Sequence, residues 1–547
     1  MKKVLSIILT CTLIFTLAFP VFCRQGVVSN VTPVVYIAGD SNEISYENGT
    51  KSFEINDLFS IFGDSEESSI TEAAFNILYP FIMEGIAFDK WDNYYDAVYK
   101  ELADVYGPIR LDNNGNAQSG TGVPEIYKRK MAADAVTDRK NPKGRYDYRE
   151  YEFYYDWRLD PIEIADKLND YIESVKKVTH SDKVSIMVKC LGNNVLLAYV
   201  DKYGTDSIKG VGIDVATSMG ADFMTGMLTG KFGIDGNSLT RTFLDLSYRN
   251  NELTELAEFV GSTIDMLDNM GVLDSISAEA RVLIYNKIEY GIISALALSA
   301  FMTMPGYWGI VSYEDFDTAL NYVFGEEGSE KRIEYAGLIE KITNFNDTIK
   351  ANALPIMKSL ENDGVNICVI SKYGLQMLPV LKDGSLVGDE YVSAHNSSFG
   401  ATTSNIYGTL SDEYIAQRVA EGKEKYISPD KQIDASTCLF PDYTWFIKGE
   451  QHGWYAPQET DLLMAVMDAD RQLTIDDFDF SQYLVISYDE AETLSSMTEE
   501  NCHNELWQAD EKTDHPETKQ ERLTSFLKTL FRWIRSLWNF LALKLKG

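Results

Sequence analysis

The sequence predicts an α/β fold built on a mainly parallel central sheet. Short apolar runs, rich in β-branched residues, recur along the chain at residues 33–38, 183–188, 210–216 and 365–370. Strands buried inside a parallel sheet read as continuous apolar runs, and parallel neighbours need crossover connections, which are usually helical. The 547 residues are 45% hydrophobic, which supports a large core and excludes a mainly disordered or collagen-like chain.

Helical patterns stand beside these runs. Residues 162–178 place apolar side chains at helical spacing, and Pro161 stands at the expected first turn, where proline is favoured. The apolar positions are Ile164, Leu168, Tyr171, Ile172 and Val175. A second helix is expected at 193–203, directly after the strand at 183–188.

The longest helical patterns fall in one block, residues 217–350, which we interpret as a cap inserted over the sheet. The expected core therefore comprises residues 26–216 and 351–488. A last core strand is expected around Trp445, Phe446 and Ile447.

The N-terminus has the features of an export signal. Lys2 and Lys3 precede an uncharged apolar stretch at 4–19, which ends at Pro20. We expect residues 1–25 to be a cleaved signal peptide and the protein to reach the extracellular or cell-envelope surface. An uncleaved anchor and a lipoprotein modified at Cys23 are the alternatives.

Charge is distributed unevenly along the chain. The formal net charge of −34 excludes binding to nucleic acid through a dense basic face. Residues 489–520, rich in Asp and Glu, are expected to be an acidic linker. Residues 521–547 are basic, and their leucines recur every three or four residues. This pattern predicts an amphipathic helix at a membrane surface, with docking on the protein's own body or in an oligomer as the alternative.

One strand–turn–helix segment carries a candidate nucleophile. Residues 188–192 read Val-Lys-Cys-Leu-Gly, between the strand at 183–188 and the helix at 193–203. They resemble the G-x-S-x-G turn of α/β hydrolases, with Cys190 at the nucleophile position. The positive end of a helix favours a thiolate there. A buried, inert cysteine is the alternative.

A base and an acid are available later in the chain. His452 lies on a Gly-flanked loop after the last expected strand, and Asp389 follows the strand at 365–370. The order Cys190, Asp389, His452 is the order nucleophile, acid, base of α/β hydrolases. An ordinary loop histidine and a turn aspartate are the alternatives, and Glu390 is the rival acid. No Cys or His pair shows metal-ligand spacing, so neither metal nor cofactor is expected.

Three segments carry a family resemblance. Residues 154–161, Tyr-Tyr-Asp-Trp-Arg-Leu-Asp-Pro, are similar to the Y-D-W-R-L-x-P signature of the lecithin:cholesterol acyltransferase-like branch of α/β hydrolases. Residues 304–309 resemble that family's cap region, and residues 388–392 resemble its acid loop. The resemblance covers roughly residues 30–470. It implies a Ser–Asp–His triad, a helical lid, and hydrolysis or transfer of acyl esters.

The resemblance assigns further roles. Cys190 falls on the family's serine, Asp389 on its acid and His452 on its base. The N–H of Leu191 and the loop containing Gly39 and Asp40 would form the oxyanion hole, and Trp157 and Arg158 would wall the pocket. The sequence departs from the family at Val188, Lys189 and Asn193, where Gly, His and Gly are usual.

The expected protein is thus an exported α/β hydrolase acting on lipid or other acyl esters. One alternative is a catalytically silent protein of the same fold that binds lipid or glycan at the cell envelope. Another is a structural membrane-surface protein in which the C-terminal helix is the functional part.

Overall fold

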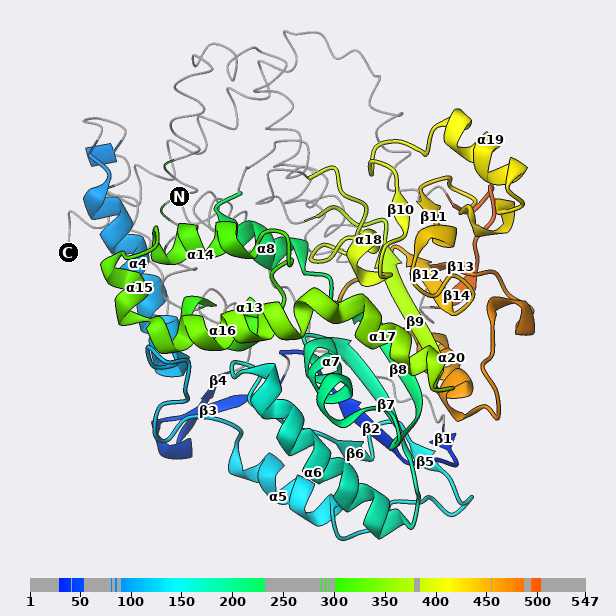
Figure 1. The fold of residues 1–547 in the computed structure, drawn as a ribbon, viewed down its shortest axis with the longest axis horizontal. Coiled ribbons are helices and arrows are strands. Elements are labelled where there is room, and N and C mark those ends of the chain that lie inside the picture. Colours follow the sequence, from blue (N-terminus) through cyan, green and yellow to red (C-terminus); the bar gives the residue numbers. More distant parts are fainter. Residues whose placement is uncertain are drawn as a thin grey trace, which may run out of the picture.

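The computed structural model describes residues 29–40, 42–53, 90–231, 301–377, 384–453, 455–486 and 493–502, with isolated positions at 80, 84–85, 287, 291 and 295. Its centre is a mixed α/β body with one eight-stranded sheet in the order β14-β13-β12-β9-β8-β7-β2-β6 (Figure 1). Neighbouring strands run parallel except for β13 and β14. The predicted α/β class is confirmed, and the sheet is consistent with an α/β-hydrolase-like fold.

The expected strands all form. They are β2 (Val34–Ile37), β7 (Val184–Cys190), β8 (Ile208–Ala216), β9 (Asn366–Tyr373) and β12 (Thr444–Lys448). Every residue of β2, β9 and β12 is buried, which explains why each reads as an unbroken run. The sheet is completed by β6 (Tyr151–Glu152), β13 (Tyr483–Ile486) and β14 (Leu494–Ser496).

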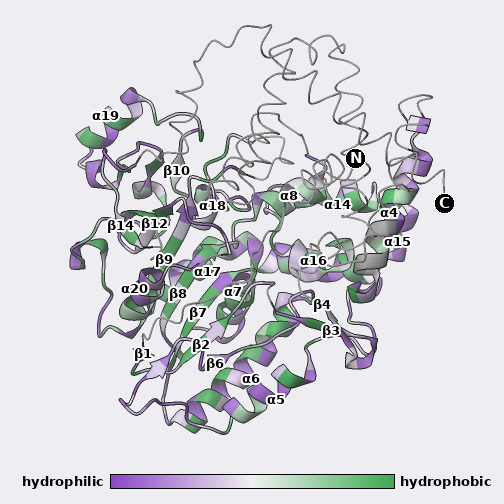
Figure 2. Cartoon of the chain, turned by 180° about the vertical axis from the view of Figure 1, so that it is seen from behind, coloured by the Kyte–Doolittle hydropathy of each residue, from purple (hydrophilic) through white to green (hydrophobic). Residues whose placement is uncertain are grey.

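Helices cover both faces of this sheet. On one face lie α6 (Pro161–Thr179), α7 (Gly192–Tyr203) and α17 (Ala353–Asn362); on the other lies α20 (Pro457–Asp468). Side chains alternate accordingly, since Ile186 and Val188 belong to the core beneath α7 whereas Met187 packs with α20. Figure 2 shows the apolar residues concentrated on the central strands.

Specific residues place two of these helices. Asp160 caps α6 by accepting a hydrogen bond from the Ile162 N–H at 3.0 Å, with Pro161 at the first helical position. Gly210 in β8 lets α20 approach, because a methyl group there would lie 2.4 Å from the Met467 carbonyl oxygen. The backbones of β8 and α20 therefore pack directly against each other at Gly210.

Smaller elements surround the sheet. The helices are α4 (Asp92–Tyr106), α5 (Glu125–Asp134), α18 (Ala394–Ser397) and α19 (Asp412–Ala420). Two-stranded pairs form between β1 (Ser29–Asn30) and β5 (Tyr146–Asp147), between β3 (Ile44–Tyr46) and β4 (Lys51–Phe53), and between β10 (Thr402–Thr403) and β11 (Ile433–Asp434).

The predicted cap at 217–350 is described only at its two ends, and both ends are helical. They contain α8 (Asp222–Thr229), α13 (Pro305–Trp308), α14 (Phe316–Phe324), α15 (Glu330–Glu334) and α16 (Ala336–Thr348). The predicted signal peptide at 1–25 and amphipathic helix at 521–547 lie outside the described residues. No helix among the described residues has both the length and the apolar character needed to cross a bilayer.

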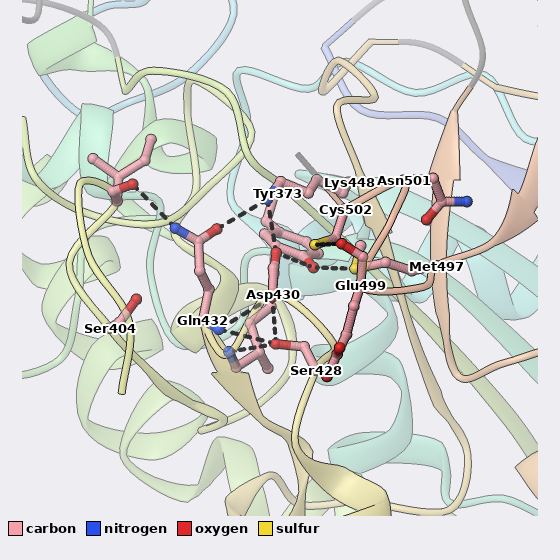
Figure 3. Close-up of polar contacts among 12 residues, drawn as sticks. Tyr373, Ser404, Ser428, Asp430, Gln432, Lys448, Met497, Glu499, Asn501 and Cys502 are labelled. Atoms are coloured by element: carbon pink, nitrogen blue, oxygen red, sulfur yellow. Dashed lines mark hydrogen bonds and ion pairs between the residues drawn. The ribbon is translucent and has the colours of Figure 1, made fainter. Parts of the chain in front are cut away.

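The ordered fold extends beyond the predicted boundary at 488. Within the stretch expected to be an acidic linker, β14 pairs antiparallel with β13. Met497 and Cys502 are buried, and Met497 lies against Tyr373 (Figure 3). These few apolar anchors hold residues 494–502 on the core despite the surrounding acidic composition, so the linker assignment is corrected for this part.

Candidate active site

Cys190 stands on a sharp turn between β7 and α7. Its φ is +47°, a left-handed conformation that non-glycine residues adopt rarely. Only Leu191 separates the strand from the helix. Gly192 admits the end of β2, because a methyl group there would lie 2.8 Å from the carbonyl oxygens of Ile37 and Ala38. This is the strained strand–turn–helix geometry that exposes a nucleophile in α/β hydrolases.

Two of the departures from the family pattern, Val188 and Asn193, have packing or hydrogen-bonding roles at this turn. Val188 is fully buried and pairs with Ile37 and Ile213 inside the sheet, so its branched side chain fills core space. The Cys190 carbonyl accepts two side-chain hydrogen bonds, from Asn193 Nδ2 and from Thr217 Oγ1, each at 2.9 Å. These donors hold the turn from α7 and from the end of β8.

Asp389 and His452 form a hydrogen-bonded pair. The distance between Asp389 Oδ2 and His452 Nδ1 is 2.8 Å, and the carboxylate has no exposed surface. Asp389 Oδ1 accepts hydrogen bonds from the N–H groups of Tyr391 and Val392 at 3.1 and 2.9 Å. With one oxygen held by the backbone, the other is aimed at the imidazole. This decides between Asp389 and its neighbour Glu390 as the partner of His452.

Cys190 influences the imidazole of His452 as well. Burial opposes the imidazolium, but the Asp389 carboxylate and Cys190 favour it, and the pKa of His452 stands well above its ordinary value. Since Nδ1 is engaged by Asp389, Nε2 is the nitrogen that remains to accept a proton.

The predicted oxyanion loop passes beside the thiol. A methyl group on Gly39 would lie 3.1 Å from Cys190 Cβ and 3.7 Å from the Leu191 nitrogen. The first N–H groups of a helix have no partner within the helix, and Leu191 immediately precedes α7. The Asp40 side chain accepts a hydrogen bond from the Tyr307 hydroxyl at 2.8 Å, so it is turned toward α13.

Trp157 and Arg158, predicted as pocket wall, are both buried. The Trp157 indole N–H donates to the Asn42 carbonyl at 2.7 Å, and its ring meets Tyr307 edge-on at 5.5 Å. Arg158 is fully buried, and its guanidinium donates to Asp156 at 2.8 and 2.6 Å. The Arg158 guanidinium thus stabilises the local chain through Asp156. The Trp157 ring contacts Tyr307, whose hydroxyl donates to Asp40.

Two of the three segments that resemble the family, residues 154–161 and 304–309, contact each other. The Gly306 N–H donates to the Arg158 carbonyl at 3.0 Å, which joins residues 304–309 to residues 154–161. Tyr307 then connects this junction to Asp40. Nothing in the sequence indicated that Thr217 would contact the Cys190 turn or that the Tyr391 N–H would contact Asp389, and Asn193 stood out only as a departure from the family pattern. Only their positions in space reveal these contacts.

Other histidines are engaged elsewhere. His395 Nδ1 lies 2.9 Å from the Ala401 carbonyl oxygen, and His180 ends α6 in a left-handed conformation. Among the described residues no three His, Cys, Asp or Glu side chains gather into a group that could hold a metal ion.

No protein-family model matches this chain, and no curated protein matches it. Among solved structures, it is similar to a chain in the crystal structure of the Tle4–Tli4 complex. The identity is 11%, the match covers 80% of this chain and 98% of that chain, and the TM-score is 0.28. A similarity this low carries no argument, so the functional conclusion depends on the geometry of the site itself.

Proposed function

We propose that this protein is an α/β hydrolase that cleaves or transfers acyl esters with Cys190 as its nucleophile. The observation that carries the proposal is the strained Cys190 turn together with an imidazole whose Nδ1 is hydrogen-bonded to a buried carboxylate and whose protonated form Cys190 favours. Nucleophile, base and orienting acid in series are the recognised arrangement for acyl transfer on several unrelated folds.

In the first half-reaction, His452 Nε2 takes the proton of the Cys190 thiol, and the thiolate attacks the ester carbonyl carbon. The tetrahedral oxyanion is stabilised by the Leu191 N–H and the backbone of the Gly39 loop. When the intermediate collapses, the C–O bond to the leaving alcohol breaks and the imidazolium returns the proton to that alcohol. The acyl group is left on sulfur as a thioester.

In the second half-reaction, water or an alcohol gives a proton to His452 and attacks the thioester. Collapse breaks the C–S bond, releases an acid or a new ester, and restores the thiol with the proton from His452. Asp389 holds one tautomer of the imidazole and stabilises the imidazolium in both halves. The lipid class of the ester follows from the resemblance to lecithin:cholesterol acyltransferases.

The test is turnover of p-nitrophenyl esters and fluorescent phospholipids under reducing conditions. Wild type is compared with Cys190→Ala, Cys190→Ser and the matched control Cys438→Ala, since Cys438 is a buried free cysteine in another core. Cys190→Ala is expected to lose at least ~10³-fold in rate, and Cys438→Ala to keep it. Activity retained by Cys190→Ala, or its absence from folded wild type, would refute the proposal.

Export and binding to a membrane surface through residues 521–547 are a second part of the proposal, supported by the sequence pattern. Flotation with liposomes should recover the chain with these residues and leave behind a chain truncated at 520. Equal flotation of both chains would refute this part.

A further inference from the structure

Five ionisable side chains lie together in the core near the candidate triad. They come from five separate segments of the chain and are almost entirely buried: Lys189 in β7, Asp214 in β8, Lys372 in β9, Glu450 after β12, and Glu459 in α20. We call this group the triad-side cluster. Taking such charges out of water costs several kcal/mol for each ion, so a cluster of this size needs an explanation.

The lysines are each held by carboxylates. Lys189 Nζ lies 2.8 Å from Asp214 Oδ2. Lys372 Nζ lies 3.2 Å from Asp214 Oδ1, 3.2 Å from Glu459 Oε1 and 3.5 Å from Glu450 Oε2. Asp214 therefore bridges the two ammonium groups, and Lys372 stands at the centre of three carboxyl groups.

An aromatic ring completes the cluster. The centroid of the Tyr455 ring is 3.6 Å from Lys189 Nζ and 5.0 Å from Lys372 Nζ. A desolvated ammonium over an aromatic face is attracted by the ring quadrupole. Tyr455 belongs to the loop that carries His452, and Glu450 on the same loop accepts a hydrogen bond from the Ala456 N–H at 2.8 Å.

The charges of the triad-side cluster balance when one of its carboxyl groups is protonated. It contains two lysines and three carboxyl groups, so one proton on a carboxyl group makes it neutral. Burial and the neighbouring Asp214 and Glu450 raise the pKa of Glu459 well above its ordinary value. Burial opposes ionisation of Asp214, but Lys189 and Lys372 outweigh it and lower the pKa of Asp214 to about 2. These opposite directions assign the proton of the cluster to Glu459 and leave Asp214 ionised.

Three of the five members, and Tyr455, are close in sequence to the triad. Lys189 immediately precedes Cys190, Glu450 and Tyr455 flank His452, and Lys372 lies near the end of β9, the strand before Asp389. We propose that the triad-side cluster is the positioning device of the active site, in which Lys189 holds the strained Cys190 turn against the His452 loop through Asp214 and Tyr455.

This inference deepens the proposed function and rests on it for its catalytic meaning. It also explains why a lysine is accommodated before the nucleophile. The side chain at 189 points away from the thiol into the core, where Asp214 and the Tyr455 ring receive it. Lys189 is proposed as a positioning residue: its ammonium contacts Asp214 and the Tyr455 ring, and its effect on the thiol is transmitted through the turn.

The test measures alkylation of Cys190 by iodoacetamide in the full-length protein, followed by peptide mass spectrometry from pH 5 to 9. Lys189→Met removes the ammonium and retains an apolar stem. The matched control is Lys448→Met, because Lys448 is also a buried lysine at a strand end, paired with Asp430 at 2.7 Å. Melting temperatures of both variants separate loss of stability from loss of positioning.

Lys189→Met is expected to slow alkylation of Cys190 at least tenfold, because the turn is no longer held against the His452 loop. Lys448→Met should keep the wild-type rate at each pH. An unchanged rate in folded Lys189→Met would overturn the inference. If Lys189→Met does not fold, Tyr455→Leu should slow alkylation while Tyr455→Phe, which keeps the ring, should not; equal rates in these two variants would overturn it.

The readout separates the two proposals. Should wild type cleave no ester while Lys189→Met still slows alkylation, the positioning role stands and the proposed function fails. Should Cys190-dependent turnover be found while Lys189→Met leaves the alkylation rate unchanged, the reverse holds.

Discussion

The triad-side cluster and a second buried network, at the ends of β9 and β12, both contain lysine and carboxylate groups. They differ in the number of carboxyl groups for each ammonium group. The second network, here the edge network, comprises Tyr373, Ser428, Asp430, Gln432 and Lys448 (Figure 3). There a single carboxylate, Asp430, accepts from Lys448 at 2.7 Å, from the Tyr373 hydroxyl at 3.0 Å and from the Gln432 N–H at 3.1 Å, with the Ser428 hydroxyl at 2.5 Å. In the triad-side cluster, three carboxyl groups compete for two ammonium groups.

The difference separates a structural clamp from a functional arrangement. Asp430 has enough donors to be stable in the core, and its network ties β9 to β12 and to residues near 497. In the triad-side cluster Glu459 Oε1 lies 3.2 Å from Lys372 Nζ, but neither Glu459 oxygen has a hydrogen-bond donor in good geometry among the described residues. Buried carboxyl groups of this kind concentrate at functional sites. Four predictions test this view, and the first two use the edge network as the control.

The largest effect is expected from the acid of the triad. Asp389→Asn keeps an acceptor for the N–H groups of Tyr391 and Val392 but no longer holds the correct imidazole tautomer, so ester turnover should fall by ~10³–10⁴-fold. Asp430→Asn in the edge network should leave turnover within a few-fold of wild type. The measurement is the steady-state rate of ester turnover at a temperature where both variants are folded. Equal losses of turnover in the two variants would contradict the distinction between the two regions.

Removing the central lysine of each region should affect stability unequally. Lys372→Met leaves three carboxyl groups around an apolar side chain and should cost ~3–5 kcal/mol of unfolding free energy. Lys448→Met leaves Asp430 with three other donors and should cost ~1–2 kcal/mol. Urea unfolding gives both values, and a larger loss for Lys448→Met would contradict the distinction.

The turn between β7 and α7 offers a smaller, steric test. Gly192→Ala forces a methyl group against two carbonyl oxygens at 2.8 Å and should destabilise the fold by ~1–3 kcal/mol while lowering turnover. Gly453→Ala is the matched control beside His452, because a methyl group there meets nothing within 4 Å. Thermal unfolding and turnover of the two variants should therefore diverge, and similar values would show that the turn tolerates a side chain.

The sequence predicted the parts that depend on local pattern. The apolar runs around Val34, Ile186, Ile213 and Val369 became sheet strands, since a buried parallel strand shows itself by composition alone. Cys190 was predicted from its place between a strand and a helix, and Asp389 and His452 from their order after it. The structure places these three residues near one another. Their catalytic roles remain predictions.

What the sequence missed depends on long-range contacts. Lys189, Asp214, Lys372 and Glu459 are 25 to 270 residues apart, and each alone resembles an ordinary solvated charge. The available signal was position, because Lys189, Asp214 and Lys372 each fall within or at the end of an apolar strand. Residues 494–502 were missed because acidic composition outweighed two apolar anchors, Met497 and Cys502.

The smallest effect concerns the proton of the triad-side cluster. Because the folded pKa of Glu459 is raised above its unfolded value near ~4.5, the folded state binds the extra proton, and stability falls as pH rises through that range. Asp214 acts in the opposite direction and only in acid, since its lowered pKa contributes stability that is lost as pH falls from ~4 toward 2.

Glu459→Gln replaces the protonated carboxyl by an amide that donates without titrating. Relative to this variant, wild type should lose up to ~1.4 kcal/mol of unfolding free energy for each pH unit between 5 and 6. His452, whose raised pKa adds a slope of the same sign, acts only above its unfolded value of ~6.5 and is common to both proteins. Urea unfolding of the pair at pH 5, 5.5 and 6 measures the difference. Parallel stability curves would mean that Glu459 folds without the proton, and the neutral triad-side cluster would then have to be abandoned.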